Sequence, residues 1–222
     1  MFDANQIESE KRMRDEDGFG PEDLKDHFDV SRETLDRLQI IVGELDAWRG
    51  KSNLIGPAEF GRVWRRHILD SIQLVSQIPS NGRTIDLGAG SGFPGLVLAA
   101  CLIDPEAEIV MIESVGKKCA FLRAAIQAAN LPARVIHGRV ESIKHVHAQC
   151  VTARAFAPLP KLIEYAEPWF ANGAYGVIPK GRRWEEELTE ALESWRFAYQ
   201  AIPSVSGDGA ILKISEVSRV ER

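Results

Sequence analysis

Two stretches within the first 80 residues carry apolar side chains at helical spacing. After Ser31 they recur every three or four positions, as on one face of an amphipathic helix: Leu35, Leu38, Val42, Leu45 and Trp48. Ser31 can cap this helix, because its hydroxyl can accept a hydrogen bond from the first turn, and GKSN at 50–53 should end it. A second helical stretch follows Pro57 and ends near IPSNG at 78–82, a linker sequence. Residues 21–79 are therefore predicted to form an N-terminal helical cap.

Beyond residue 80 the pattern changes to short apolar strands that alternate with helices. Strands are predicted at 83–88, 108–114, 133–138, 149–155 and 173–181, and helices at 95–103, 117–130, 159–170 and 182–194. Two late apolar runs, at 196–205 and 210–217, are joined by SGDG and are typical of a closing hairpin that adds an antiparallel edge. This alternation predicts an α/β domain over 80–222, with a mostly parallel seven-stranded sheet and helices on both faces.

The N-terminal end differs from the rest in charge. Residues 1–30 hold ten acidic and four basic side chains and offer little apolar surface to bury. We therefore expect residues 1–20 to form a disordered acidic tail. The chain as a whole has a net charge of −5 and 45% hydrophobic residues, which are ordinary values for a soluble globular protein.

The sequence shows no pattern typical of a targeting peptide, a membrane span, a disulfide framework or a metal site. The start of the chain is not a signal or transit peptide, and the longest apolar run, 11 residues at 93–103, is too short to span a bilayer. Three cysteines lie far apart without a Cys-x-x-Cys pair, which fits a reducing compartment. His145 and His147 have no companions at metal-ligand spacing. We expect a cytoplasmic protein without a metal and without a membrane partner.

The glycine-rich stretch TIDLGAGSGFPGLVLAA at 84–100 is the main candidate site. Its glycines, Gly88, Gly90, Gly92 and Gly95, lie between the first predicted strand of the sheet and the following helix. In a doubly wound sheet ligands bind at this point, at the carboxyl ends of the strands, and glycine permits a tight turn and a close approach of the backbone. Gly90-x-Gly92-x-x-Gly95 alone also fits a crossover that binds nothing.

Two acidic residues narrow the class of ligand. Glu113 ends the second strand of the sheet, where it can accept hydrogen bonds from ribose hydroxyls of a dinucleotide or of S-adenosylmethionine. Asp86 lies just ahead of the glycines and can organise their turn, or the ammonium end of a methyl donor through water. We also expect no substrate domain after the hairpin, although dehydrogenases of this fold usually carry one. Both points favour the methyl donor.

Four further sequence blocks, together with the glycine-rich stretch, point to one family. IDLGAGSGFPG at 85–95, RRHILDS at 65–71, GRVES at 138–142 and TARAFAPLPKL at 152–162, followed by PKG at 179–181, resemble the bacterial small-subunit ribosomal RNA guanine-N7 methyltransferases (RsmG, also called GidB). The resemblance implies a class I, Rossmann-like methyltransferase fold and S-adenosylmethionine as cofactor. It implies methylation of guanine N7 in 16S rRNA, presented as RNA or as a ribosomal subunit.

The resemblance and the glycine pattern together give the predicted contacts of the donor. These are Gly88, Gly90, Gly92, Phe93, Glu113, Val140, Glu141 and Arg154. Val140 and Glu141 would lie against the adenine, and Arg154 near both donor and RNA. No catalytic residue is assigned, because guanine N7 carries a lone pair and no proton, so that no general base is required.

Basic residues cluster in two segments, 49–67 and 114–139. This pattern fits two interpretations, solvated helix faces or a positive rim for RNA. On the second interpretation the RNA contacts are Arg65, Arg66, His67, Lys117, Arg123, Arg139 and Lys180. Two alternatives remain open: a methyltransferase acting on a small molecule or a protein, and a nucleotide-binding module without catalysis.

Overall fold

The computed structural model describes residues 14–143 and 146–221, and its centre is a seven-stranded sheet of order β3-β2-β1-β4-β5-β7-β6. All neighbours pair in parallel except β7, which is antiparallel to both β5 and β6. The predicted mostly parallel sheet is confirmed. The strands are β1 (Arg83–Leu87), β2 (Glu108–Glu113), β3 (Ala133–His137), β4 (Cys150–Thr152), β5 (Tyr175–Lys180), β6 (Trp195–Pro203) and β7 (Ala210–Arg219).

The closing hairpin enters the sheet in a way that its sequence does not reveal. Its second strand, β7, lies between β5 and β6, so that β6 forms the edge and runs in the same direction as β5. The hairpin turn at 204–209 consequently lies at the carboxyl edge of the parallel strands. This is the edge where the glycine-rich loop after β1 also lies.

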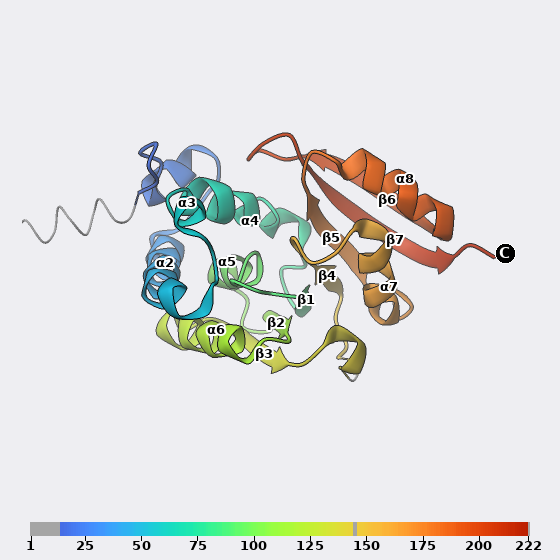
Figure 1. The fold of residues 1–222 in the computed structure, drawn as a ribbon, viewed down its shortest axis with the longest axis horizontal. Coiled ribbons are helices and arrows are strands. Elements are labelled where there is room, and N and C mark those ends of the chain that lie inside the picture. The colour runs from blue at the N-terminus through green and yellow to red at the C-terminus, as the bar shows by residue number, and fades with distance from the viewer. Residues whose placement is uncertain (1–13, 144–145, 222) are drawn as a thin grey trace, which may run out of the picture.

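Helices cover both faces of the sheet (Figure 1). One face packs against α5 (Gly95–Cys101), α6 (Gly116–Ala128) and the cap, and the other against α7 (Leu159–Phe170) and α8 (Trp184–Ser194). The period-two alternation of strand β2 divides its side chains between the two cores. Ile109 and Met111 belong to the first core, and Val110 and Ile112 to the second.

The first cap helix follows its sequence pattern. Helix α2 (Arg32–Ser52) starts at Ser31, whose Oγ accepts a hydrogen bond from the N–H of Thr34 at 3.1 Å. Its apolar face is buried and packs against α6, where Trp48 meets Phe121 at 6.3 Å between ring centroids. The remaining N-terminal turn is η1 (Pro21–Asp26).

The second cap helix is interrupted. The stretch after Pro57 consists of α3 (Pro57–Phe60), the π-helical η2 (Trp64–Leu69), α4 (Asp70–Ile72) and η3 (Val75–Gln77). The carboxylate of Asp15 accepts hydrogen bonds from the N–H groups of Trp64 at 2.9 Å and Arg65 at 2.8 Å, where η2 begins. A partner 49 residues away therefore satisfies these two backbone groups, which local periodicity cannot indicate.

Two expected boundaries differ in the structure. Of the expected acidic tail, residues 1–13 lie outside the described residues, whereas over 14–20 Asp15 and Phe19 are buried against the cap. The fourth strand ends at Thr152, because Ala155 adopts a left-handed φ of 52° that turns the chain out of the sheet. The division of the chain at residues 20 and 79 stays a prediction. Among the described helices none is long and apolar enough to cross a membrane.

Candidate methyl-donor and RNA site

The glycine-rich loop connects the carboxyl end of β1 to the start of α5. Gly88 and Gly92 have φ values of 66° and 87°, which side chains rarely adopt. A Cβ atom at Gly88 would also collide with the ring of Phe156, which follows β4. Both restrictions keep the main chain of this loop bare, so that a ligand could approach it closely.

The carboxyl groups of Asp86 and Glu113 hold the loop by accepting hydrogen bonds from its backbone N–H groups. Asp86 Oδ2 accepts a hydrogen bond from the N–H of Gly95 at 3.0 Å. Glu113 Oε2 accepts one from the N–H of Gly90 at 2.8 Å, and its Oε1 accepts another from Val115 at 2.7 Å. Asp86 therefore organises the glycine turn, the first of the two roles expected for it. The oxygens of Glu113 each retain a lone pair that could accept a further hydrogen bond.

The two carboxyl groups differ in their surroundings. Asp86 is fully buried, and burial raises its pKa from 3.8 to about 7. The negative charge of Glu113 adds to this increase, whereas the hydrogen bond from Gly95 opposes it. Asp86 Oδ1 is buried and has no hydrogen-bond partner among the described residues. A buried acceptor of this kind is a candidate contact for a polar ligand group.

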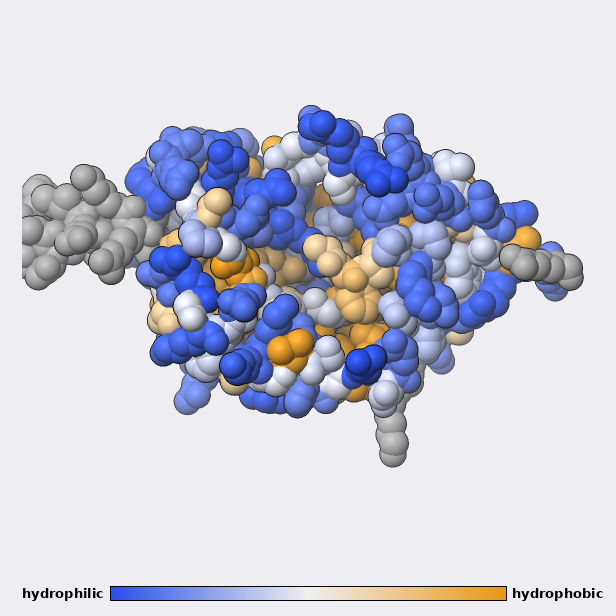
Figure 2. Space-filling view, viewed as in Figure 1, coloured by the Kyte–Doolittle hydropathy of each residue, from blue (hydrophilic) through white to orange (hydrophobic). Residues whose placement is uncertain are grey.

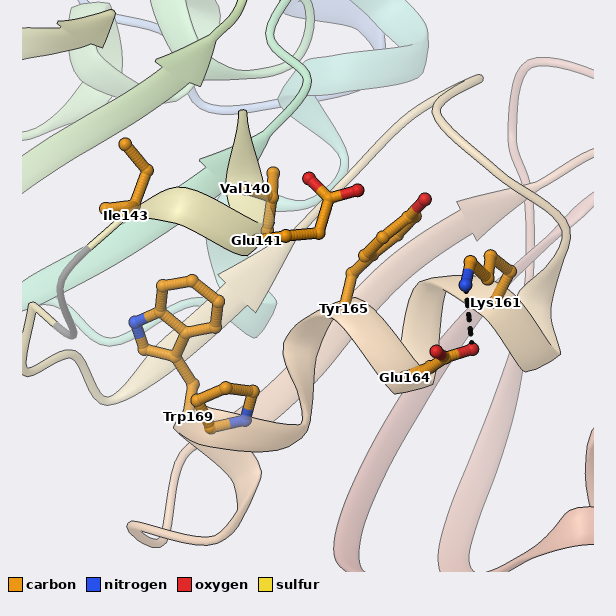
Figure 3. A pocket seen from close by; sticks show the side chains of 8 residues that line it. Val140, Glu141, Ile143, Lys161, Glu164, Tyr165 and Trp169 are labelled. Carbon is orange, nitrogen blue, oxygen red and sulfur yellow. Dashed lines mark hydrogen bonds and ion pairs between the residues drawn. The ribbon is translucent and has the colours of Figure 1, made fainter. Parts of the chain in front are cut away.

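A cavity of about 260 Å³ lies between η4 (Val140–Ser142) and α7, and its lining comes from these two elements and Ile143 rather than from the glycine-rich loop. Figure 3 shows Val140 and Glu141 on one side of this cavity and the side chains of α7 on the other. Its lining is formed by Val140, Glu141, Ile143, Lys161, Glu164, Tyr165, Pro168 and Trp169. In Figure 2 the surface is hollowed between the cap and α7, and apolar residues gather around the hollow. The cavity thus adjoins the two residues predicted to lie against an adenine.

Arg154 joins this edge of the sheet to the cap. It follows β4, and its Nε lies 2.9 Å from Asp70 Oδ2 of the cap. Its Nη2 donates a hydrogen bond to the carbonyl of Arg66 at 2.9 Å. The RRHILDS block also contacts the glycine-rich loop, because His67 stacks on Phe93, although 16 residues lie between Ser71 and Gly88 in the sequence.

A family model described as rRNA small subunit methyltransferase G (GidB) matches residues 34–209. The chain is 59% identical over 192 residues to the ribosomal RNA small subunit methyltransferase G of Hyphomonas neptunium, covering 86% of this chain and 92% of that protein. It is 41% identical to the Paramagnetospirillum magneticum protein of the same name, covering 90% and 97%.

This chain belongs to the rRNA small subunit methyltransferase G family.

Solved structures agree in fold. An O-methyltransferase from Bacillus cereus in complex with SAH matches with a TM-score of 0.56 at 16% identity, covering 88% of this chain and 96% of that one. The SAH-bound methyltransferase PaMTH1 of Podospora anserina matches with a TM-score of 0.54 at 14% identity, covering 85% and 97%. At these identities the likeness concerns the class I methyltransferase fold, which the resemblance had implied.

The structure of this methyltransferase places most of the predicted RNA contacts on its surface. Arg65 and Arg66 are exposed on η2, with 49% and 61% of their side chains accessible. Lys117 in the first turn of α6 and Arg139 after β3 are exposed at the carboxyl edge. Arg123 is exposed further along α6. Arg65 also pairs with Asp17 at 3.0 Å and Arg66 with Glu59 at 3.4 Å, both in exposed ion pairs.

Two other predicted RNA contacts, Lys180 and His67, are largely buried rather than exposed. Lys180 at the end of β5 is only 9% exposed, and its ammonium lies 2.7 Å from Glu187 Oε2 of α8. It also donates to the carbonyl of Ala157 at 2.9 Å. His67 is buried and packs against Phe93 of the glycine-rich loop. Neither side chain is part of the exposed rim, because each is used in contacts within the protein.

Sequence reasoning missed one polar residue of this site. Asp70 lies within the quoted RRHILDS block but was assigned no role, and it makes the hydrogen bonds described below. Its position three residues after His67 on a helix was the available signal. Of the expected histidine pair, His145 lies outside the described residues, and within the described part no group of three or more His, Cys, Asp or Glu could hold a metal ion.

Proposed function

We propose that this chain methylates N7 of a guanine in small-subunit ribosomal RNA, with S-adenosylmethionine as the methyl donor. The observation that carries the proposal is the glycine-rich loop between Asp86 and Glu113, in a chain of the rRNA small subunit methyltransferase G family. The relatives that it matches are named as methyltransferases of small-subunit ribosomal RNA.

The residues around the loop fit such a donor in three respects. At Gly90 the only atom within 4 Å of an added Cβ is the carbonyl oxygen of Gly88, so the main chain is open to a ligand at this position. Glu113 has acceptor capacity for ribose hydroxyls, and the unpaired Asp86 Oδ1 can accept from an ammonium group, directly or through water. Val140 and Glu141 border a cavity that can take the adenine. Phe93 in the loop completes the proposed donor site, and Arg154, which was predicted to lie near the donor, instead binds the cap through its guanidinium.

The chemistry places few demands on the protein. The donor supplies a methyl group activated by a sulfonium, and guanine N7 attacks with its own lone pair. Since no proton has to be removed, the residues of the site serve to bind and orient rather than to act as a base. Positioning of the two reactants can lower the barrier by about 7–11 kcal/mol in favourable cases.

The exposed cations favour RNA over a small molecule or a protein as substrate. The molecule has a net charge of −5, yet five of the predicted RNA contacts are exposed cations: Arg65, Arg66, Lys117, Arg123 and Arg139. Such a local rim can bind phosphates even on an acidic protein. Negative charge on the rest of the surface would weaken the binding of RNA to the other faces of the molecule.

Two measurements test the proposal. Calorimetric titration with S-adenosylhomocysteine should show binding to the wild type and at least tenfold weaker binding to Glu113→Ala, whereas the exposed Glu106→Ala serves as control. N7-methylguanine should disappear from 16S rRNA when the gene is deleted and return on complementation. Absence of binding at millimolar ligand, or unchanged rRNA after deletion, would contradict the proposal. Methyl transfer to a protein or metabolite instead would support the alternative.

A further inference from the structure

Arg154 contacts three partners on one short segment of the cap. Its Nε lies 2.9 Å from Asp70 Oδ2, its Nη1 lies 2.8 Å from His67 Nδ1, and its Nη2 donates to the carbonyl of Arg66 at 2.9 Å. Only 19% of the Arg154 side chain is exposed. Three of the five N–H groups of its guanidinium thus bind the cap rather than a ligand.

His67 connects the same segment to the glycine-rich loop. Its ring is stacked on that of Phe93, with centroids 4.9 Å apart and planes inclined by 13°. Burial, together with the charges of Arg154 and Arg66, lowers the pKa of His67 to about 3. The imidazole ring is therefore neutral. Because its Nδ1 faces an N–H donor of Arg154, the single ring proton lies on Nε2. Nε2 is 3.3 Å from Glu59 Oε2.

Asp70 extends the contacts to a third loop. Its Oδ2 faces Arg154, while its Oδ1 accepts hydrogen bonds from Ser206 Oγ at 2.6 Å and from Gln73 Nε2 at 3.1 Å. Ser206 belongs to the β6–β7 turn, and Gln73 also binds this turn through the N–H of Val205 at 3.0 Å. A single helical segment thereby holds the glycine-rich loop, the segment after β4 and the hairpin turn.

We infer that Asp70, His67 and Arg154 are positioning residues that fix the helix bearing Arg65 and Arg66 relative to the donor site. This inference rests on the proposed function. Arg65 and Arg66 are exposed on η2, whereas His67 of the same element is buried and Asp70, at the start of α4, is partly buried. RNA bound by these arginines is then held at a set distance and angle from the glycine-rich loop. In-line transfer is sensitive to this alignment, since a misplacement of about 1 Å can cost on the order of 100-fold in rate.

Substitutions can separate this role from ligand contact. Asp70→Asn keeps the size of the side chain and removes its charge, and His67→Phe keeps a ring for stacking but loses the acceptor. Both variants should bind S-adenosylhomocysteine and RNA within about threefold of the wild type, whereas kcat should fall by about tenfold or more. Asp208→Asn is the matched control, because Asp208 lies in the same hairpin turn but pairs with the exposed Arg182.

Combined variants test whether the residues act together. If Asp70 and Arg154 form one unit, Asp70→Asn with Arg154→Lys should lower kcat no more than the stronger single substitution does. His67→Asn, which keeps an acceptor for Arg154 but not the ring, should retain more activity than His67→Ala. Multiplicative effects, or a loss that lies entirely in KM or ligand affinity, would overturn the inference in favour of direct contact.

Hydrogen exchange of the ligand-free protein gives a readout that does not depend on activity. Asp70→Asn should speed amide exchange in 64–73, in 88–95 and in 204–209 together, and Asp208→Asn should not affect the first two segments. Exchange confined to 64–73, with kcat unchanged, would show a merely structural role and overturn the inference. Failure of the wild type to bind donor or to methylate rRNA would instead contradict the proposed function.

Discussion

At the scale of single residues, the site depends on groups that water cannot reach. Asp86 is buried in strand β1 with one oxygen bound to Gly95 and the other without a partner among the described residues. A buried carboxyl group favours its neutral form, because the charged form would lose its hydration. Its titration consequently becomes coupled to the stability of the fold.

The raised pKa of Asp86 predicts a pH dependence of stability. Between pH 3.8 and about 7 the folded state holds a proton on Asp86 that the unfolded state has released. The contribution of Asp86 is thus fully present below pH 3.8 and is lost as pH rises through 7, by up to about 1.4 kcal/mol per pH unit. Asp86→Asn should remove this slope, as measured by urea unfolding of both proteins at several pH values.

The comparison must be made as a difference between the two proteins. His67 contributes the opposite slope, since its pKa is lowered from 6.5 to about 3 and its neutral form stabilises the fold as pH rises across that range. This contribution is common to wild type and Asp86→Asn and cancels in the difference. Parallel stability profiles of the two proteins would contradict the prediction.

Gly88 is predicted to tolerate no side chain. Gly88→Ala places a Cβ at a φ of 66° and against the ring of Phe156, which should cost about 1–2 kcal/mol of stability and weaken donor binding. Gly43→Ala, in the middle of α2 with nothing within 4 Å of the new Cβ, should instead stabilise the protein by about 1 kcal/mol. Thermal unfolding and donor titration of both variants check this contrast.

At the scale of elements, the cap is assembled from pieces that lie far apart in sequence. The segment 14–20 packs against η2 and supplies the carboxylate of Asp15 to its first N–H groups. Next to it, Asp17 forms an exposed pair with Arg65, whose guanidinium also lies 4.3 Å from the ring centre of Phe19. The start of η2, which carries Arg65 and Arg66, is thus held by contacts with the acidic segment 14–20.

Asp15 is predicted to stabilise the cap far more than Asp17 does. Asp15→Ala leaves two backbone N–H groups at the start of η2 without their acceptor and should cost about 1–3 kcal/mol. Asp17→Ala removes an exposed pair and should change stability little. Denaturant unfolding of the two variants measures the difference, and equal effects would show that the buried hydrogen bonds are not what anchors this segment.

At the scale of the whole molecule, charge is segregated rather than balanced. The net charge is −5, and the exposed cations around the donor site therefore stand against an acidic background. Strand β3 offers a natural comparison, because Arg134 lies near its amino end and Arg139 just after its carboxyl end. Both are exposed, but only Arg139 lies at the carboxyl edge of the sheet, the edge that also holds the glycine-rich loop after β1.

The two ends of β3 should differ in RNA affinity. Arg139→Gln should weaken binding of a 16S rRNA fragment and lower the slope of log K against log salt by about 0.7–0.9, the value for one lost phosphate contact. Arg134→Gln, which removes a partner of Glu108 at the opposite edge, should leave both quantities unchanged. Affinity measurements at three or more salt concentrations decide between a local rim and a uniform surface effect.

The sequence by itself determined the kinds of elements and their order. Spacing along α2, the alternation of strands and helices, and the glycine-rich stretch after β1 are local signals, because each is written in residues a few positions apart. The four family blocks likewise fixed the class of enzyme. Given these, the position of the loop at the carboxyl edge of the sheet follows from chain direction alone.

Only the tertiary structure decided how the cap meets the site. The interruption of the cap helix at η2 depends on Asp15. The burial of Lys180 depends on its ion pair with Glu187. The position of His67 depends on its contacts with Phe93 and Arg154. Arg154 and His67 are 87 residues apart, and such pairs leave no periodic trace in a sequence. The sequence therefore predicted RNA contacts at buried and at exposed basic residues alike. It could not separate them, because burial is set by packing between distant segments and not by residue type.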